Sequence, residues 1–125
     1  MKTEDFLKEY AAALLTYSAN EIAGFYQVPL TVYADDGILQ VTEMSEVVNF
    51  WLAGVEPYRK QGVVNTVPEM IQEEQLSKTI RTCKVKWNNF NTSGKKAGVE
   101  TNFYILSETE DGLKITGLII TTAKE

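Results

Sequence analysis

The 125-residue sequence contains no histidine, and this absence restricts its chemistry more than any other feature of the composition. A Ser-His-Asp triad, a Cys-His pair and a histidine-ligated zinc site all need an imidazole ring. Any acid–base chemistry must therefore use a carboxylate, a tyrosine or a lysine with a shifted pKa. We expect no metal site and no cofactor.

Cysteine is almost absent too. The single Cys83 cannot form an internal disulfide, which is typical of a reducing compartment, and one thiol cannot build a thiolate metal cluster. The opening residues, MKTEDFLKEYAAALL, carry acidic side chains where a secretory signal would be basic, and charges interrupt their apolar residues. We therefore expect a cytoplasmic protein with no signal peptide and no membrane contact.

The charge balance also argues against a nucleic-acid partner. Seventeen acidic and twelve basic residues give a net charge of −5, whereas a protein that follows phosphates needs a clustered basic face. Neighbouring acids dilute the basic residues between Arg81 and Lys96, which are typical of a solvated strand face. With 44% apolar residues and no linker, repeat or low-complexity tract, residues 1–125 are expected to form one domain.

The N-terminal half has helical periodicity. Apolar side chains recur at intervals of three and four over residues 3–17, which predicts an amphipathic helix. Ser18 and Glu21 form a capping-box pattern, which predicts a second helix through about Tyr26, ended by Pro29. A third helix is predicted to begin at a Thr42 cap.

Strand patterns fill the remainder of the chain. The third helix should end near Gly62, and a hairpin with its turn at residues 35–37 should precede that helix. Residues 63–75 contain Pro68 and are predicted to be broken, bulged or at a sheet edge. Alternating runs follow through the sequence LKITGLIITTA at residues 113–123, so the fold class is α+β, with helices packed on an antiparallel sheet.

The last strand should be covered on both faces. Leu118, Ile119 and Ile120 are consecutive, so they present apolar side chains to both sides of the sheet. The helices cover one side, and a second copy of the chain is the economical cover for the other. We expect a homodimer formed through the outer sheet face.

Four motifs in this order resemble one superfamily across essentially the whole chain: FLKEYAAALLTYSANEIAGFY, then P-x-x-x-Y-x-D-D-G, then TEMSEVVNFW, and finally YILSETEDGLKITG. They resemble the nuclear transport factor 2-like fold, and most closely its small polyketide-cyclase-like bacterial members. The resemblance implies a cone of three N-terminal helices and a curved antiparallel sheet that encloses a cavity. It also implies a frequent dimer through the outer face of the sheet.

The isomerase branch of that superfamily offers a residue-level comparison. The resemblance places Tyr10 at the oxyanion-hole tyrosine, and Tyr26 and Trp51 at supporting aromatic positions. The catalytic base position falls on Ala34, with Asp35 one residue further along and so on the opposite strand face.

Other parts of the comparison match less well. The second oxyanion donor falls near Thr101 or Asn102. Dehydratase-like members rely on histidine, which this chain lacks, and epoxide-hydrolase-like members need an Asp-Arg-Asp network for which Arg59 and Arg81 are the candidates.

Three functions remain open. The leading hypothesis is a dimer whose mostly apolar cavity binds a small organic ligand. The second is an isomerase or cyclase with Asp35 as base and Tyr10 as hydrogen-bond donor to an enolate-like oxygen. The third is a non-catalytic scaffold whose cavity is filled by its own aromatic side chains. The residues predicted to contact a ligand are Tyr10, Leu14, Tyr26, Tyr33, Trp51, Cys83, Trp87, Asn102 and Tyr104.

Overall fold

A computed structural model describes residues 1–121 of the chain. The helices are α1 (Thr3–Leu14), α2 (Ala19–Ala23), α3 (Met44–Gly54) and α4 (Glu56–Gln61). The strands are β1 (Tyr26–Ala34), β2 (Gly37–Val41), β3 (Val63–Gln75), β4 (Ile80–Asn91), β5 (Lys96–Thr109) and β6 (Gly112–Ile120). The last two residues of the run predicted as the final strand, 122 and 123, lie outside the described part.

The first helix is shorter than its periodicity predicts. It ends at Leu14, and Tyr17 adopts a left-handed backbone conformation with φ at 56°. The chain turns there because the Tyr17 hydroxyl donates a hydrogen bond to the carbonyl of Val63, at the start of β3. A long-range contact therefore decides where the helix ends.

The second helix begins as predicted but ends early. The Ser18 hydroxyl accepts a hydrogen bond from the Glu21 amide, and the helix ends at Ala23. Pro29 does not terminate it, because Pro29 lies inside β1 at an exposed position. A missing amide proton is tolerated there, since β1 and β6 pair at Tyr26 and again from Thr31, with an irregular register between.

The third predicted helix is divided in two. Glu43, rather than Thr42, caps α3, because its amide and the Glu46 carboxylate form a capping box. Val55 separates α3 from α4, and Pro57 in the first turn of α4 has no amide proton to continue the α3 hydrogen bonds. The second segment ends at Gly62, as predicted.

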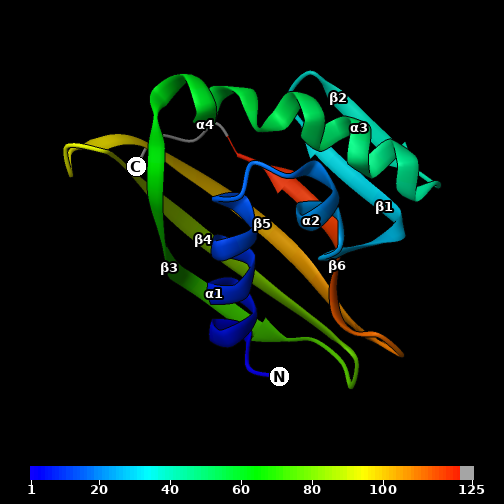
Figure 1. The fold of residues 1–125 in the computed structure, drawn as a ribbon. Coiled ribbons are helices and arrows are strands. Elements are labelled where there is room, and N and C mark those ends of the chain that lie inside the picture. The colour runs from blue at the N-terminus through cyan, green and yellow to red at the C-terminus, as the bar shows by residue number, and fades with distance from the viewer. Residues whose placement is uncertain (122–125) are drawn as a thin grey trace.

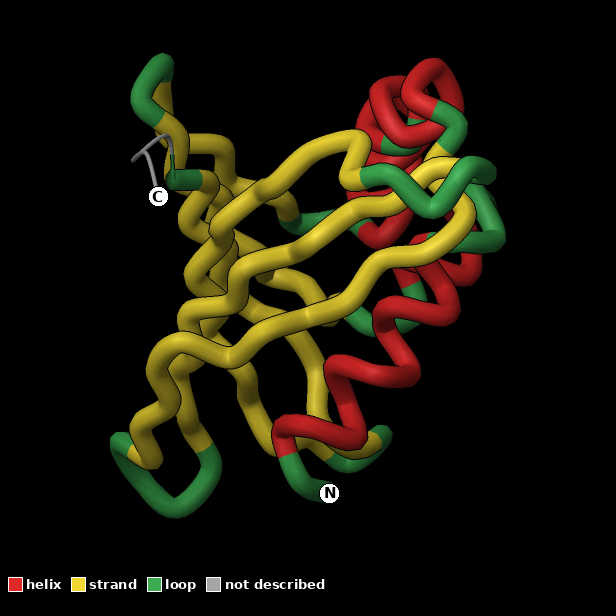
Figure 2. Tube along the Cα trace, turned by 90° about the vertical axis from the view of Figure 1, so that its left-hand side faces the viewer, coloured by secondary structure: helices red, strands yellow, loops and turns green. Residues whose placement is uncertain are grey.

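One six-stranded sheet runs in the order β2-β1-β6-β5-β4-β3. Its pairings are antiparallel except that of β1 with β6, which is parallel. β3 lies at an edge, with two register shifts against β4, as the proline in this strand indicated. Figure 1 shows the strands fanning out behind α1, and in the turned view of Figure 2 the helices lie on one side of the curved sheet.

The core lies between the helices and the inner face of the sheet. The alternation predicted for β4 is observed: Cys83, Val85 and Trp87 are all buried. The start of α1 is held to the sheet by Arg81, whose guanidinium bonds the Met1 carbonyl, the Thr3 hydroxyl and the Glu108 carboxylate. No helix in the described part is long and apolar enough to cross a membrane.

Candidate functional site

A pocket of about 770 Å³ opens between the inner face of the sheet and the helices α1, α3 and α4. Helical residues in its wall are Tyr10, Leu14, Phe50, Trp51, Gly54 and Tyr58. The remaining wall residues are Tyr26, Lys86, Trp87, Val99, Glu100, Thr101, Asn102, Tyr104, Leu118, Ile120 and Thr121. Seven aromatic rings and few charged groups line it, a composition typical of a site for an organic molecule.

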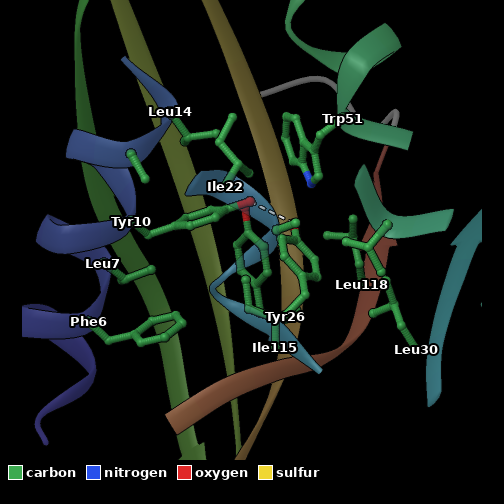
Figure 3. Packing of buried hydrophobic residues seen from close by; sticks show 14 of the residues in the cluster. Phe6, Leu7, Tyr10, Leu14, Ile22, Tyr26, Leu30, Trp51, Ile115 and Leu118 are labelled. Atoms are coloured by element: carbon green, nitrogen blue, oxygen red, sulfur yellow. Dashed lines mark hydrogen bonds between the residues drawn. The ribbon is translucent and has the colours of Figure 1, made fainter. Parts of the chain in front are cut away.

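A pair of buried tyrosines lies in the wall. The hydroxyls of Tyr10 on α1 and Tyr26 on β1 are 2.6 Å apart, and Figure 3 shows the two side chains meeting from opposite elements. Burial raises the pKa of Tyr26 to about 12, although its hydrogen bonds favour the ionised form, and burial also raises the pKa of Tyr10. Both phenols are therefore neutral hydrogen-bonding groups at physiological pH.

The indole of Trp51 supplies a donor without an acceptor. Its Nε1 atom is buried and has no hydrogen-bond partner among residues 1–121. The indole N–H faces the Tyr26 hydroxyl closely enough to favour the phenolate, but the geometry falls short of a hydrogen bond. A buried donor left unpaired is costly, so an acceptor on a bound molecule would be favourable here.

The other tryptophan of the pocket is satisfied. Trp87 Nε1 donates to the Tyr104 hydroxyl over 2.9 Å, across the neighbouring strands β4 and β5. Burial raises the pKa of Tyr104 as well. The two tryptophans thus line one pocket, but among the described residues only the Trp87 N–H has a hydrogen-bond acceptor.

One carboxylate lies in the pocket wall. Glu100, Asn102 and Tyr104 alternate along the inner face of β5, as their spacing predicted. Glu100 Oε2 accepts a hydrogen bond of 2.5 Å from the Tyr58 hydroxyl on α4. Burial, together with the Glu100 charge, raises the pKa of Tyr58, so this phenol is a hydrogen-bond donor at neutral pH.

The structure gathers seven of the nine residues predicted to contact a ligand, and their binding role stays a prediction. They are Tyr10, Leu14, Tyr26, Trp51, Trp87, Asn102 and Tyr104. Tyr33 lies elsewhere, with 40% of its surface exposed. Cys83 is fully buried outside the pocket wall, and burial raises the pKa of its thiol to about 12, which makes it unreactive.

Asp35, the predicted base, is not part of the pocket wall. It lies in the exposed turn between β1 and β2. Arg81 on β4 is also outside the wall and bonds residues at the start of α1, and Arg59 pairs with Glu56 on the surface of α4. The structure therefore places none of these three residues among the pocket's aromatic groups.

Several polar wall residues were not among the predicted contacts, and Glu100 and Tyr58 are two of them. Glu100 shares a strand face with Asn102 and Tyr104, and this period of two was its available signal. Tyr58 lies within the third predicted helix, but nothing in the sequence joins it to Glu100, 42 residues away. Within residues 1–121, no group of three His, Cys, Asp or Glu side chains is placed to hold a metal ion.

Solved structures share this fold. A domain of unknown function with a cystatin-like fold from Nostoc punctiforme matches with a TM-score of 0.74 and 14% identity, over 100% of this chain and 81% of that one. An NTF2-like protein of unknown function from Shewanella oneidensis matches with a TM-score of 0.71 and 13% identity, over 93% of both chains. A ketosteroid isomerase-like protein from Erwinia carotovora atroseptica matches with a TM-score of 0.65 and 11% identity, over 93% and 89%. At these identities the likeness establishes the fold alone.

The fold thus defines a cystatin-like, NTF2-like α+β cone. A family model described as NTF2-like protein (DUF6841) matches residues 1–123, and the chain belongs to this family. The superfamily resemblance in the sequence is confirmed. No curated protein matches the sequence.

Proposed function

We propose that the protein binds a small, largely apolar organic molecule in the pocket between its helices and sheet. The observation that carries this proposal is the unpaired Trp51 Nε1–H in the wall of a pocket of about 770 Å³. That volume falls within the range of roughly 300–1,000 Å³ common for small-molecule sites. The apolar rings supply contact area, and the indole N–H selects a ligand with a hydrogen-bond acceptor.

The open pocket also argues against the third hypothesis, a scaffold whose cavity is filled by its own aromatic side chains. Tyr10, Tyr26 and Trp51 pack against one another without closing the space beside them. A scaffold that used the fold only to assemble would gain stability by filling this space, because empty volume forfeits packing contacts. Ligand binding explains why these aromatic residues leave it open.

An enzyme of the isomerase or cyclase type is the second candidate. Asp35 would have to leave its turn to act as base, whereas Glu100 is already a carboxylate in the pocket wall. The Tyr10–Tyr26 pair supplies hydroxyl donors suited to an enolate oxygen. Exchange of α-protons of a bound ketone for deuterium, lost in Glu100→Gln, would favour this candidate over simple binding.

The binding proposal is tested by nuclear magnetic resonance of the indole N–H groups. A neutral aromatic ketone, 2-acetylnaphthalene, is titrated into the uniformly ¹⁵N-labelled protein. We expect the Trp51 indole proton to move downfield, because it gains an acceptor, with a smaller change at Trp87, whose N–H is already bonded. The variant Trp51→Phe should bind the ketone several-fold more weakly than Trp87→Phe does.

Two outcomes would contradict the proposal. One is the absence of any shift in pocket resonances up to the solubility limit of the ketone. The other is equal loss of affinity in the two variants, because both remove the same indole bulk and only one removes an unpaired donor.

We also propose that the protein is a homodimer through the outer face of the sheet. The strand register aligns an apolar row across that face, formed by Ile38, Tyr33, Ile119 and Phe103 on four adjacent strands. Ile38 and Tyr33 are 71% and 40% exposed in the single chain. A second copy would remove this row from water.

A further inference from the structure

We propose that the pocket selects organic cations, with Glu100 as the charged contact and the surrounding aromatic rings as the wall that holds an ammonium group. This inference rests on the proposed binding function and deepens it by naming the class of ligand. It commits to a protonated amine or a quaternary ammonium group attached to an apolar, preferably aromatic, body.

The carboxylate of Glu100 has no ion-pair partner among the described residues. It lies in a wall that is otherwise mainly aromatic and apolar, and in the described part of the chain it accepts a single hydrogen bond, from Tyr58. The ion pairs of the described residues join Arg59 to Glu56 and Arg81 to Glu108, so no described cation neutralises Glu100. A carboxylate with spare lone pairs in such a wall is stabilised most by a positively charged donor.

Lys86 is the one cationic side chain in the described pocket wall, and its position does not oppose this reading. Trp87 points to the buried face of β4, so Lys86 leaves the strand on the opposite face. On that face it is aligned with Glu69 of β3 on one side and Thr101 of β5 on the other. Lys86 contributes to the wall but forms no ion pair with Glu100.

Aromatic side chains line the same pocket wall as the Glu100 carboxylate. Tyr58 binds Glu100 directly, and Trp87 is aligned with Glu100 across β4 and β5. Trp51 and Phe50 approach from α3, with their ring centres 5.8 Å apart. Electron-rich rings attract cations, and a carboxylate that shares a pocket wall with several aromatic rings favours alkylammonium groups.

Neutral and anionic ligands would gain less than a cation from this pocket wall. A neutral hydroxyl could donate one hydrogen bond to Glu100, but it would leave the carboxylate charge uncompensated. An anionic ligand would be repelled by Glu100 and by the net charge of −5 on the whole chain. The cation is therefore the ligand class that gains from both the carboxylate and the rings.

The test uses three probes that share a naphthalene body and a two-carbon reach. They are 2-(naphthalen-2-yl)ethylamine, which is protonated at neutral pH, 2-(naphthalen-2-yl)ethanol and naphthalen-2-ylacetate. Affinities are measured by titration of tryptophan fluorescence and of indole N–H resonances. We expect the amine to bind about tenfold more tightly than the alcohol, and the carboxylate most weakly.

Two variants locate the selectivity. Glu100→Gln keeps the shape of the side chain and should reduce the amine-to-alcohol ratio to within about twofold, chiefly by weakening amine binding. Glu69→Gln removes an equal charge from an exposed position outside the pocket wall and should preserve the ratio. This matched control separates a contact with Glu100 from the general field of an acidic protein.

The outcomes separate this inference from the binding proposal. If the alcohol or 2-acetylnaphthalene binds as tightly as the amine, or if Glu100→Gln keeps the preference, cation selectivity is wrong and the binding proposal stands. If neither the three probes nor 2-acetylnaphthalene binds, both proposals are wrong.

Discussion

Four tyrosines near the pocket are held in their neutral form by burial. Tyr10, Tyr26, Tyr58 and Tyr104 all have a raised pKa, with that of Tyr26 at about 12. In the unfolded chain each phenol ionises near pH 10. As the pH rises past 10, the unfolded state therefore loses protons before the folded state does, and folding stability decreases.

We predict that the free energy of unfolding decreases steeply between pH 10 and 12. The Tyr26 contribution alone is on the order of 2–3 kcal/mol, because a shift of two pKa units separates its folded and unfolded states. Urea unfolding at pH 8, 10 and 11 measures the decrease. Below pH 10, these tyrosines should contribute no slope.

Two variants check the origin of this slope. Tyr26→Phe should reduce the slope above pH 10, and Cys83→Ala should reduce it from about pH 9, since the thiol pKa is raised to about 12. Appearance of phenolate absorbance from the four buried tyrosines in fully folded protein at pH 10.5 would contradict the prediction.

The sequence predicts which aromatic residues are buried more readily than it predicts their partners. Helical spacing placed Tyr10 on the buried face of α1, and this is confirmed. The contact of Tyr10 with Tyr26 depends on the turn after Leu14 and on α2, which bring residues sixteen positions apart together. The carboxylate in the pocket is likewise set by the β5 register, so Glu100 lies there and Asp35 does not.

Among the elements, helix ends differ most from the sequence-based prediction. Local signals place the starts correctly where a side chain caps the backbone, as Ser18 does. The ends of α1 and α3 are set by contacts or prolines, namely the Tyr17–Val63 hydrogen bond and Pro57. The end of α4 is the exception, because it is set by the residue at that position, Gly62, which adopts a left-handed conformation.

Substitution of Gly62 tests whether its backbone conformation ends α4. Its φ of 66° is left-handed, and a Cβ added there would meet no atom within 4 Å, so the cost of a side chain is conformational alone. We predict that Gly62→Ala lowers the free energy of unfolding by about 1 kcal/mol. Gly62→Asn should cost less, since asparagine tolerates this conformation better. Chemical denaturation measures both, and equal losses would indicate a steric cause instead.

Across the whole molecule, the outer sheet face leaves a row of apolar side chains uncovered. Phe103 ends this row on β5, between Ile119 on β6 and Lys84 on β4. We predict that Phe103→Lys converts the proposed dimer to monomers, because it puts an unpaired positive charge into the proposed interface, next to Lys84. Light scattering during size-exclusion chromatography measures the mass.

A matched control variant measures the effect on the oligomeric state of adding a lysine elsewhere on the surface. Leu52→Lys changes an apolar residue that is 57% exposed on α3, away from the outer sheet face, and should leave the dimer intact. Tyr33→Lys, in the apolar row, should weaken the dimer without disturbing the core. A wild-type chain that elutes as a monomer would contradict the proposed assembly outright.

The pocket wall is drawn from distant parts of the chain, from Tyr10 on the first helix to Thr121 beyond the last strand. No fragment that ends before β6 contains all of it, so the proposed binding site is complete only once β6 has joined the sheet. A bound molecule consequently stabilises the finished native state and no earlier intermediate. Under the binding proposal, occupancy of the pocket reports the completeness of folding, and ligand supply would set how much of the protein survives proteolysis in the cell.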